Sequence, residues 1–180
     1  MVRTLVLGGA RSGKSAHAER LVPESDPVTY LATGRRDPGD REWAERIAAH
    51  VSRRPDSWRT VEAGDADSLR RVLGDAGSDA TVLVDDLATW LTGVLDDAGA
   101  WDRDPVALDE VAGHCAGLVD AVVGCAARLV IVSAEVGLGV VPSTPSGRLF
   151  RDELGSLNAR LADVCDEVVL LVAGQPLRLR

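Results

Sequence analysis

Hydrophobic residues along the chain fall into short apolar runs that alternate with longer segments of mixed polarity. Several of the runs end at Gly or at acidic residues, which is typical of strands buried within a sheet. The runs predict strands at residues 2–7, 28–32, 58–62, 81–85, 128–133, 168–173 and 177–180.

The segments between these runs have helical character, and they predict helices at residues 14–21, 41–51, 67–73, 87–95, 106–126 and 148–162. Strands that alternate with helices predict an α/β fold, in which helices cover a mainly parallel sheet. Gly174-Gln175-Pro176 separates the last two runs and predicts an antiparallel C-terminal hairpin. No linker or repeat interrupts the pattern, so we expect a single domain over residues 1–180.

Composition narrows the class of protein. Hydrophobic residues make up 46% and charged residues 27%, which is an ordinary globular balance. The net charge of −8 argues against broad nucleic-acid binding, which needs an excess of Lys and Arg. The N-terminal run leads straight into a glycine-rich loop, no run is long enough to span a bilayer, and Cys115, Cys125 and Cys165 have no CxxC spacing. We therefore expect a reduced, cytoplasmic protein without a zinc site or membrane insertion.

A phosphate-binding loop lies between the first predicted strand and the first predicted helix. Its sequence is Gly8-Gly9-Ala10-Arg11-Ser12-Gly13-Lys14-Ser15, which has the spacing G-x-x-x-x-G-K-S. Glycines let successive backbone N–H groups converge on phosphate oxygens, and the following helix N-terminus adds partial positive charge. Lys14 can reach β- and γ-phosphate oxygens, and the Ser15 hydroxyl can bind Mg²⁺. The loop therefore predicts a P-loop NTPase-type three-layer sandwich that binds nucleotides.

A second acidic element is expected on a neighbouring strand to organise Mg²⁺. The run Thr81-Val82-Leu83-Val84-Asp85 is apolar and ends in an acid, so Asp85 is the candidate metal-site residue beside Ser15. Asp86 is adjacent, but alternation along a strand predicts that its side chain points elsewhere. The alternative is that both acids form a solvated strand end.

Further segments, taken with the phosphate loop, resemble one family in order over nearly the whole chain. They are Tyr30-Leu31-Ala32-Thr33, Arg46-Ile47-Ala48-Ala49-His50, Arg54-Pro55 with Trp58-Arg59-Thr60-Val61-Glu62, Val84-Asp85 with Trp90-Leu91-Thr92, Glu135-Val136-Gly137-Leu138-Gly139-Val140-Val141-Pro142, and Arg148-Leu149-Phe150-Arg151-Asp152 with Gly155 and Asn158. The chain resembles the adenosylcobinamide kinase/adenosylcobinamide-phosphate guanylyltransferase family, whose members act in cobalamin biosynthesis.

The resemblance implies two reactions on one nucleotide site. ATP or GTP first phosphorylates adenosylcobinamide. GTP then transfers GMP to a histidine with release of pyrophosphate, and adenosylcobinamide phosphate takes up the GMP to give adenosylcobinamide-GDP. The family's histidine falls on His50. A neutral imidazole is a competent nucleophile near neutral pH, whereas a lone histidine without this motif is more often a surface residue.

The resemblance also assigns the remaining site residues. Lys14 joins His50 as a catalytic residue, Ser15 and Asp85 hold Mg²⁺, and His17 and His114 are expected to be structural. The residues implied to contact nucleotide are Gly8, Gly9, Ala10, Arg11, Ser12, Gly13, Lys14, Ser15, Ala32, Thr33, Gly34, Val51, Ser52, Arg53, Arg54, Glu62 and Asp85. A carboxylate such as Glu62 can accept hydrogen bonds from guanine, which would favour GTP.

Several alternatives stay open at this stage. Arg53 and Arg54 either clamp phosphates or are simply solvated, and loop 135–142 is either a substrate or subunit contact or a tight turn. The family implies a homo-oligomer, a trimer. An ordinary small-molecule kinase of this fold would need no nucleophilic histidine, and a GTP-dependent switch would need no cobinamide.

Overall fold

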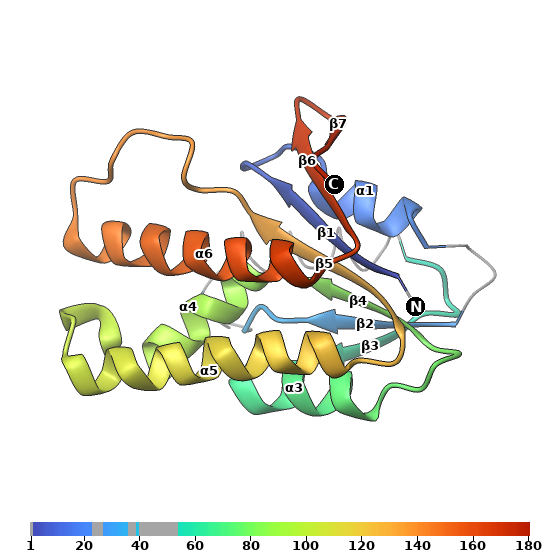
Figure 1. Ribbon diagram of the computed structural model, residues 1–180, viewed down its shortest axis with the longest axis horizontal. Coiled ribbons are helices and arrows are strands. Elements are labelled where there is room, and N and C mark those ends of the chain that lie inside the picture. The colour runs from blue at the N-terminus through green and yellow to red at the C-terminus, as the bar shows by residue number, and fades with distance from the viewer. Residues whose placement is uncertain (1, 23–26, 36–38, 40–53) are drawn as a thin grey trace.

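The strands among the described residues form one sheet, which is parallel except at one edge. A computed structural model describes residues 2–22, 27–35, 39 and 54–180. In this part of the chain seven strands are ordered β3-β2-β4-β5-β1-β6-β7 (Figure 1). Their bounds are β1 Arg3–Gly8, β2 Val28–Ala32, β3 Arg59–Glu62, β4 Thr81–Asp85, β5 Arg128–Ala134, β6 Glu167–Val172 and β7 Gln175–Arg178. Only β6 and β7 pair in antiparallel fashion.

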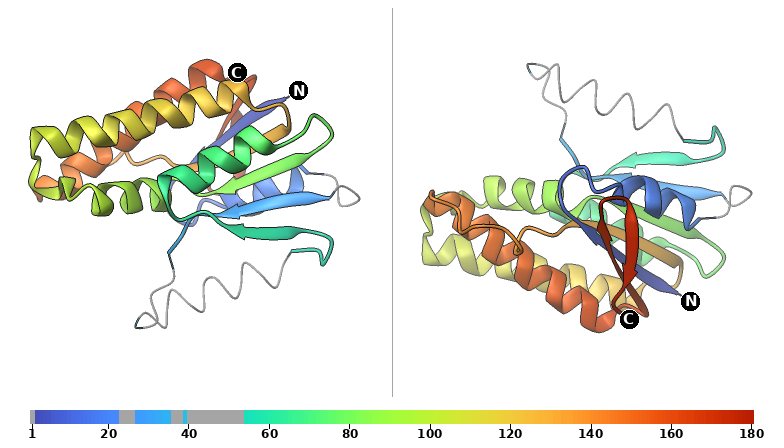
Figure 2. Two further views of the ribbon diagram at one scale, coloured as in Figure 1. Left: turned by 90° about the horizontal axis from the view of Figure 1, so that it is seen from below. Right: turned by 90° about the horizontal axis from the view of Figure 1, so that it is seen from above.

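Helices cover both faces of this sheet. Helix α1 (Lys14–Arg20) lies on one face and contacts β1, β4 and β5. The other face is covered by the helices that follow β3 (Figure 2). These are α3 Ala66–Asp75, α4 Leu87–Asp97, the short 3-10 helix η1 Ala100–Asp102, α5 Pro105–Gly124 and α6 Pro145–Val164. The predicted α/β sandwich with a mainly parallel sheet and an antiparallel C-terminal hairpin is confirmed.

Two apolar cores follow from this layering. Residues of β1 and β4 alternate between the faces, so Leu5 and Val82 belong to the larger core under α3–α6, whereas Val6 and Leu83 belong to the smaller core under α1. Burial on both faces explains why these strands read as continuous apolar runs rather than as alternating ones.

The starts of α3, α4, α5 and α6 are fixed by polar residues that the sequence places just ahead of each of them. The side chains of Asp65, Asp86, Asp104 and Thr144 accept hydrogen bonds from backbone N–H groups in the first turns of α3, α4, α5 and α6. These bonds satisfy N–H groups that have no partner within the helix. Pro105 and Pro145 follow two of the caps, in a position where a missing N–H costs nothing.

The structure differs from the predicted elements mainly at their ends. Helix α6 begins at Pro145 rather than at 148, because Thr144 and Pro145 together form a cap. The final turn is Ala173-Gly174, so Pro176 lies on the edge strand β7, where a ladder hydrogen bond can be absent. Helix η1 was not predicted, and the helix predicted at residues 41–51 lies outside the described residues.

Candidate nucleotide-binding site

The phosphate loop connects β1 to α1 at the carboxyl end of the sheet. Gly13, at the start of α1, has φ of 89°, a left-handed conformation that favours glycine. Gly8 is required for a different reason, since a Cβ there would overlap Ser12 Oγ. The Ser12 N–H donates to the Gly9 carbonyl at 3.3 Å, which closes the turn. The loop Gly8–Ser15 therefore has the strand–turn–helix context that the sequence predicted.

The Asp85 carboxylate is bound from two sides. The Ser15 hydroxyl donates to Oδ1 at 3.1 Å, and the Tyr30 phenol donates to Oδ2 at 2.6 Å. Burial, together with the Asp85 charge and this hydrogen bond, raises the pKa of Tyr30, so the phenol keeps its proton and remains a donor. The structure thus brings together Ser15 and Asp85, the two predicted metal-site residues.

Asp86 lies at the same site, and the expectation that it points elsewhere is wrong. Asp86 is the first residue after β4 and caps α4, so strand alternation no longer sets its direction. One carboxylate oxygen accepts from the Thr89 N–H at 3.0 Å, and the other lies 4.0 Å from Lys14 Nζ. Burial raises the pKa of the Asp86 carboxyl, and the neighbouring Asp85 charge acts in the same direction.

The predicted contact segment after β2 is tied to these two acids. Ala32 pairs with Asp85 on one side and with Glu62 on the other. The Thr33 hydroxyl is buried, donates to the Asp86 carbonyl at 2.6 Å and lies 2.6 Å from the Thr89 hydroxyl. The Thr33 side chain therefore holds the β2 and β4 ends together.

Arg54 is fixed over the ring of Tyr30. Its guanidinium carbon lies 3.3 Å from the ring centroid, and Nη1 donates to the Thr60 hydroxyl at 3.2 Å. Trp58 stacks against the same ring, with centroids 6.3 Å apart. Tyr30 therefore links Arg54 to Asp85. The sequence includes Tyr30 among the segments that carry the resemblance, but nothing in it showed that the phenol reaches an acid 55 positions later.

Other predicted residues lie elsewhere or outside the described residues. Glu62 is exposed at the end of the edge strand β3. The two histidines that were predicted to be structural lie on helices: His114 Nε2 is 3.8 Å from Glu110 Oε1 on α5, and burial lowers the pKa of His17 on α1. His50, Val51, Ser52 and Arg53 lie outside the described residues, so their predicted roles stay predictions.

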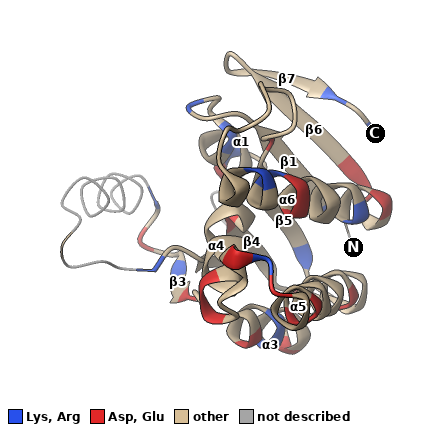
Figure 3. Cartoon of the chain, turned by 90° about the vertical axis from the view of Figure 1, so that its left-hand side faces the viewer, with Lys and Arg blue, Asp and Glu red and all other residues tan. Residues whose placement is uncertain are grey.

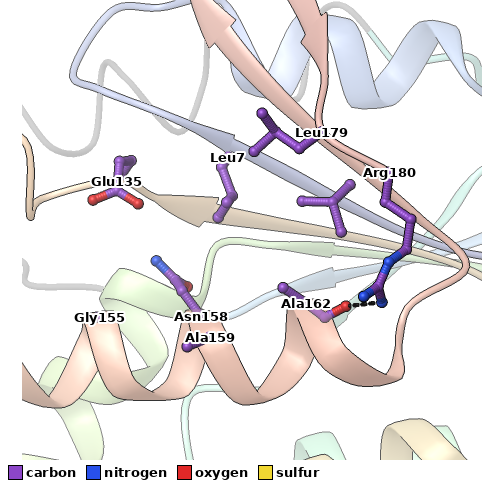
Figure 4. Close-up of a pocket in the computed structure, with 9 residues that line it drawn as sticks. Leu7, Glu135, Gly155, Asn158, Ala159, Ala162, Leu179 and Arg180 are labelled. Atoms are coloured by element: carbon purple, nitrogen blue, oxygen red, sulfur yellow. Dashed lines mark hydrogen bonds between the residues drawn. The ribbon is translucent and has the colours of Figure 1, made fainter.

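A separate cavity of about 300 Å³ lies between α6 and the sheet, on the face opposite α1. Glu135 lines one part of it and Arg180 another (Figure 4). Both side chains are already engaged, because Glu135 accepts from the Gly137 N–H at 2.7 Å and Arg180 donates to the Ala162 carbonyl at 2.6 Å. Asn158 is buried here, where its side-chain oxygen accepts from the Ser133 hydroxyl and its amide nitrogen donates to the Ala134 carbonyl.

Comparison with protein families gives a match over residues 4–179 to cobinamide kinase / cobinamide phosphate guanyltransferase. The chain belongs to this family of enzymes. It is 42% identical to the bifunctional adenosylcobalamin biosynthesis protein CobP of Pseudomonas aeruginosa, over 99% of this chain and 98% of that protein. It is 40% identical to CobU of Escherichia coli and 39% identical to CobU of Salmonella typhimurium, which carry the same description, over 98% of each chain.

A solved structure supports the fold of this family member independently. An ATPase from a type III secretion system of pathogenic bacteria superposes with a TM-score of 0.55 at 12% identity. The match covers 95% of this chain and 51% of the ATPase chain, and at this low identity it concerns the fold alone. No helix among the described residues has the length and apolar character needed to cross a membrane.

Proposed function

We propose that the protein phosphorylates adenosylcobinamide with ATP or GTP and then transfers GMP from GTP to the product, giving adenosylcobinamide-GDP and pyrophosphate. The observation that carries the proposal is that Ser15 and Lys14 of the phosphate loop meet Asp85 and Asp86 respectively, in a chain from this family. The names of its relatives, which describe bifunctional proteins of adenosylcobalamin biosynthesis, support the two-step reading.

Mg²⁺ fits the oxygen pair formed by Ser15 and Asp85. The hydroxyl and the carboxylate oxygen lie 3.1 Å apart, and both are hard oxygen ligands. The described residues contain no cluster of three or more His, Cys, Asp or Glu, which suits an ion that keeps waters and phosphate oxygens in its shell. When bound, Mg²⁺ would offset charge on the phosphate oxygens. The hydrogen bonds from Ser15 and Tyr30 would keep the Asp85 carboxylate in position.

Lys14 and the loop amides would hold the triphosphate in both reactions. Backbone N–H groups of the loop and the N-terminus of α1 offer donors to phosphate oxygens. Lys14 has a side chain that is 15% exposed and lies near Asp86, which limits its freedom before a nucleotide binds. In the kinase step the cobinamide hydroxyl would attack the γ-phosphorus and lose its proton, while the bond from the γ-phosphorus to the β,γ-bridging oxygen breaks and the nucleoside diphosphate leaves. Lys14 would offset charge that develops on the transferred group.

His50 would be the nucleophile of the guanylyl step. Its imidazole nitrogen would attack the α-phosphorus of GTP, the bond to the bridging oxygen would break, and pyrophosphate would leave. A phosphate oxygen of adenosylcobinamide phosphate would then displace the imidazole, which restores His50. Support comes from the motif Arg46-Ile47-Ala48-Ala49-His50 within the matched family region.

The nucleotide would extend from the phosphate loop across the carboxyl ends of β4, β2 and β3. Asp85, Ala32 and Glu62 are aligned in register, so two strand spacings of about 10 Å in total separate the first from the last. Glu62 would accept hydrogen bonds from guanine N–H groups. Further contacts would come from Ala32, Thr33 and Gly34, and from Val51, Ser52, Arg53 and Arg54.

Covalent labelling tests the proposal. Protein is incubated with α-labelled GTP and Mg²⁺, and we expect a labelled, acid-labile and base-stable adduct that adenosylcobinamide phosphate discharges. His50→Ala should abolish the label but keep phosphorylation of adenosylcobinamide, whereas the matched control His114→Ala should label normally. Label retained by His50→Ala would refute the nucleophile. Phosphorylation without any label in the wild type would indicate an ordinary kinase. Competition of unlabelled ATP or GTP with the labelled GTP measures which base the site prefers.

We also propose a trimeric, cytoplasmic enzyme that does not bind nucleic acid. The family resemblance supports the trimer, and light scattering on purified protein measures it directly.

The net charge of −8 disfavours binding of a polyanion such as nucleic acid, and in Figure 3 the Lys and Arg residues are spread over several elements. Filter binding with duplex DNA at low salt checks this, because measurable retention would contradict it.

A further inference from the structure

The C-terminal hairpin reaches back to the phosphate loop. Its two-residue turn, Ala173-Gly174, joins β6 to β7, and Val172 pairs with Gln175 across it. Both turn residues have positive φ, 50° and 77°, as a type I′ turn requires. The Gly174 N–H donates to the Ser12 carbonyl at 3.1 Å. The turn is therefore hydrogen-bonded to the loop immediately before Gly13.

This hydrogen bond fixes the direction of a neighbouring N–H group. The peptide unit between Ser12 and Gly13 is planar and trans, so its C=O and N–H point in opposite directions. Because the Ser12 carbonyl is held toward Gly174, the Gly13 N–H is held away from the hairpin. Gly13 itself has φ of 89°, and glycine at that position could otherwise turn its peptide planes at little cost.

The position of β6 explains how the turn gets there. Strand β6 pairs with β1 in parallel register, with Leu171 beside Gly8, so the end of β6 and the end of β1 lie at the same edge of the sheet. A Cβ built on Gly13 would lie 3.8 Å from the Gly174 Cα, which shows how closely the two backbones approach. An antiparallel hairpin at this point can reach the loop without a long connection.

We propose that Gly174 is a positioning residue for the nucleotide: the β6–β7 turn holds the Ser12–Gly13 peptide so that the Gly13 N–H is aimed at a bound phosphate. The inference rests on nucleotide binding by the phosphate loop, as in the proposed function, but not on the guanylyl step. It gives the terminal hairpin a part in binding in addition to covering a sheet edge.

A pair of glycine variants tests this role. Gly174→Ala places an L side chain at φ of 77°, with no atom within 4 Å of the new Cβ, so the variant strains the turn without a clash. Gly99→Ala is a matched control, because Gly99 has φ of 63°, equally open space, and a place between α4 and η1. In Gly174→Ala the strain should displace the N–H of residue 174 from the Ser12 carbonyl, and the weakened hydrogen bond should reduce Mg²⁺-GTP affinity by about tenfold. Gly99→Ala should lose thermal stability by a similar amount but bind as the wild type.

Two further measurements separate positioning from general damage. Asparagine and alanine both keep the backbone N–H, but asparagine tolerates the left-handed conformation better, so Gly174→Asn should bind to within about twofold of the wild type. In the wild type, reciprocity requires a non-hydrolysable GTP analogue with Mg²⁺ to slow hydrogen exchange of the Gly174 amide, by a factor comparable to the change in Kd. That NMR measurement does not depend on a variant folding.

The outcomes divide clearly. The inference would be overturned if Gly174→Ala bound the nucleotide as the wild type does, or if Gly174→Ala and Gly99→Ala lost equal affinity. It would also be overturned if the nucleotide left the hydrogen-exchange rate of the Gly174 amide unchanged. The readout is binding rather than transfer, so a wild type that binds nucleotide but forms no labelled adduct would count against the proposed guanylyl step alone.

Discussion

Asp85 shows how single residues prepare this site before any ligand is present. Its two carboxylate oxygens accept from Ser15 of α1 and from Tyr30 of β2, one oxygen from each. The Tyr30 ring itself contacts both Arg54 and Trp58. A buried ring with two such partners cannot easily turn, so the orientation of the carboxylate is set by packing as well as by hydrogen bonds.

Removing the Tyr30 hydroxyl should therefore change the Mg²⁺ concentration that the kinase reaction requires. Tyr30→Phe keeps the ring and its contacts but loses the hydrogen bond at 2.6 Å. We expect the Mg²⁺ concentration for half-maximal kinase activity to rise about three- to tenfold, with kcat at saturating Mg²⁺ near that of the wild type. Trp58→Phe alters the same aromatic pair without touching Asp85 and should titrate as the wild type. An unchanged Mg²⁺ curve for Tyr30→Phe would contradict this role.

Asp86 and Asp65 form a natural pair for pH measurements, since both cap helices but their pKa values shift in opposite directions. Burial raises the pKa of Asp86, whereas hydrogen bonds from Ser68 lower the pKa of Asp65. A raised pKa means that the folded state binds the proton more tightly, so this group reduces stability as pH rises through the folded pKa. A lowered pKa means the reverse, with stability gained as pH rises toward the unfolded value.

Asparagine keeps both caps and removes both titrations. Relative to the wild type, the Tm of Asp86→Asn should therefore increase as pH rises from about 3.8, the ordinary pKa of Asp, through the raised pKa of Asp86. The Tm of Asp65→Asn relative to the wild type should decrease as pH rises from the lowered pKa of Asp65 to the same value. Thermal melts at a series of pH values below and above about 3.8 measure the two differences. Parallel pH curves for all three proteins would refute the assignment.

At the scale of elements, the C-terminal hairpin is held in register by a turn in which only one of the two residues favours its backbone conformation. Gly174 favours a positive φ, but Ala173 adopts φ of 50°, which costs an L residue with a Cβ. Asn-Gly is the preferred pair for a type I′ turn.

Ala173→Asn should consequently stabilise the protein by about 0.5–1 kcal/mol, because asparagine tolerates this conformation better than alanine. Urea unfolding with an unchanged m value and a higher midpoint is the expected result. Ala173→Gly serves as the control for backbone freedom, and it should gain less because glycine loses more entropy on folding. A lower midpoint for Ala173→Asn would show that the Ala173 side chain makes a contact that the turn needs.

Elements with local signals were predictable from the sequence, and those that depend on neighbours were not. The bounds of β2 and β4 were predicted correctly because β2 is followed by Thr33-Gly34 and β4 ends at an acid. The loop Gly8–Ser15 was predicted from its spacing, and Asp85 from its place at the end of an apolar run. The contacts of Tyr30 and Asp86 were missed because they require strand order, which brings β2 beside β4, and knowledge that β4 ends before Asp86.

At the scale of the whole molecule, the order of the strands distributes the proposed site unevenly. The phosphate loop leaves β1, which is paired on both sides, with β5 and with β6. Asp85 ends β4, which is likewise paired on both sides. Glu62 ends β3, which has one partner among the described strands and only four residues.

This arrangement has a consequence for how the site opens and closes on its own. Amides of β1 and β4 can exchange with solvent only when the centre of the sheet comes apart, whereas those of β3 need only one ladder to open. The triphosphate would therefore be held by the part of the molecule that loosens last. The base would be read by an edge strand that can separate and re-pair many times while the phosphate loop keeps its shape.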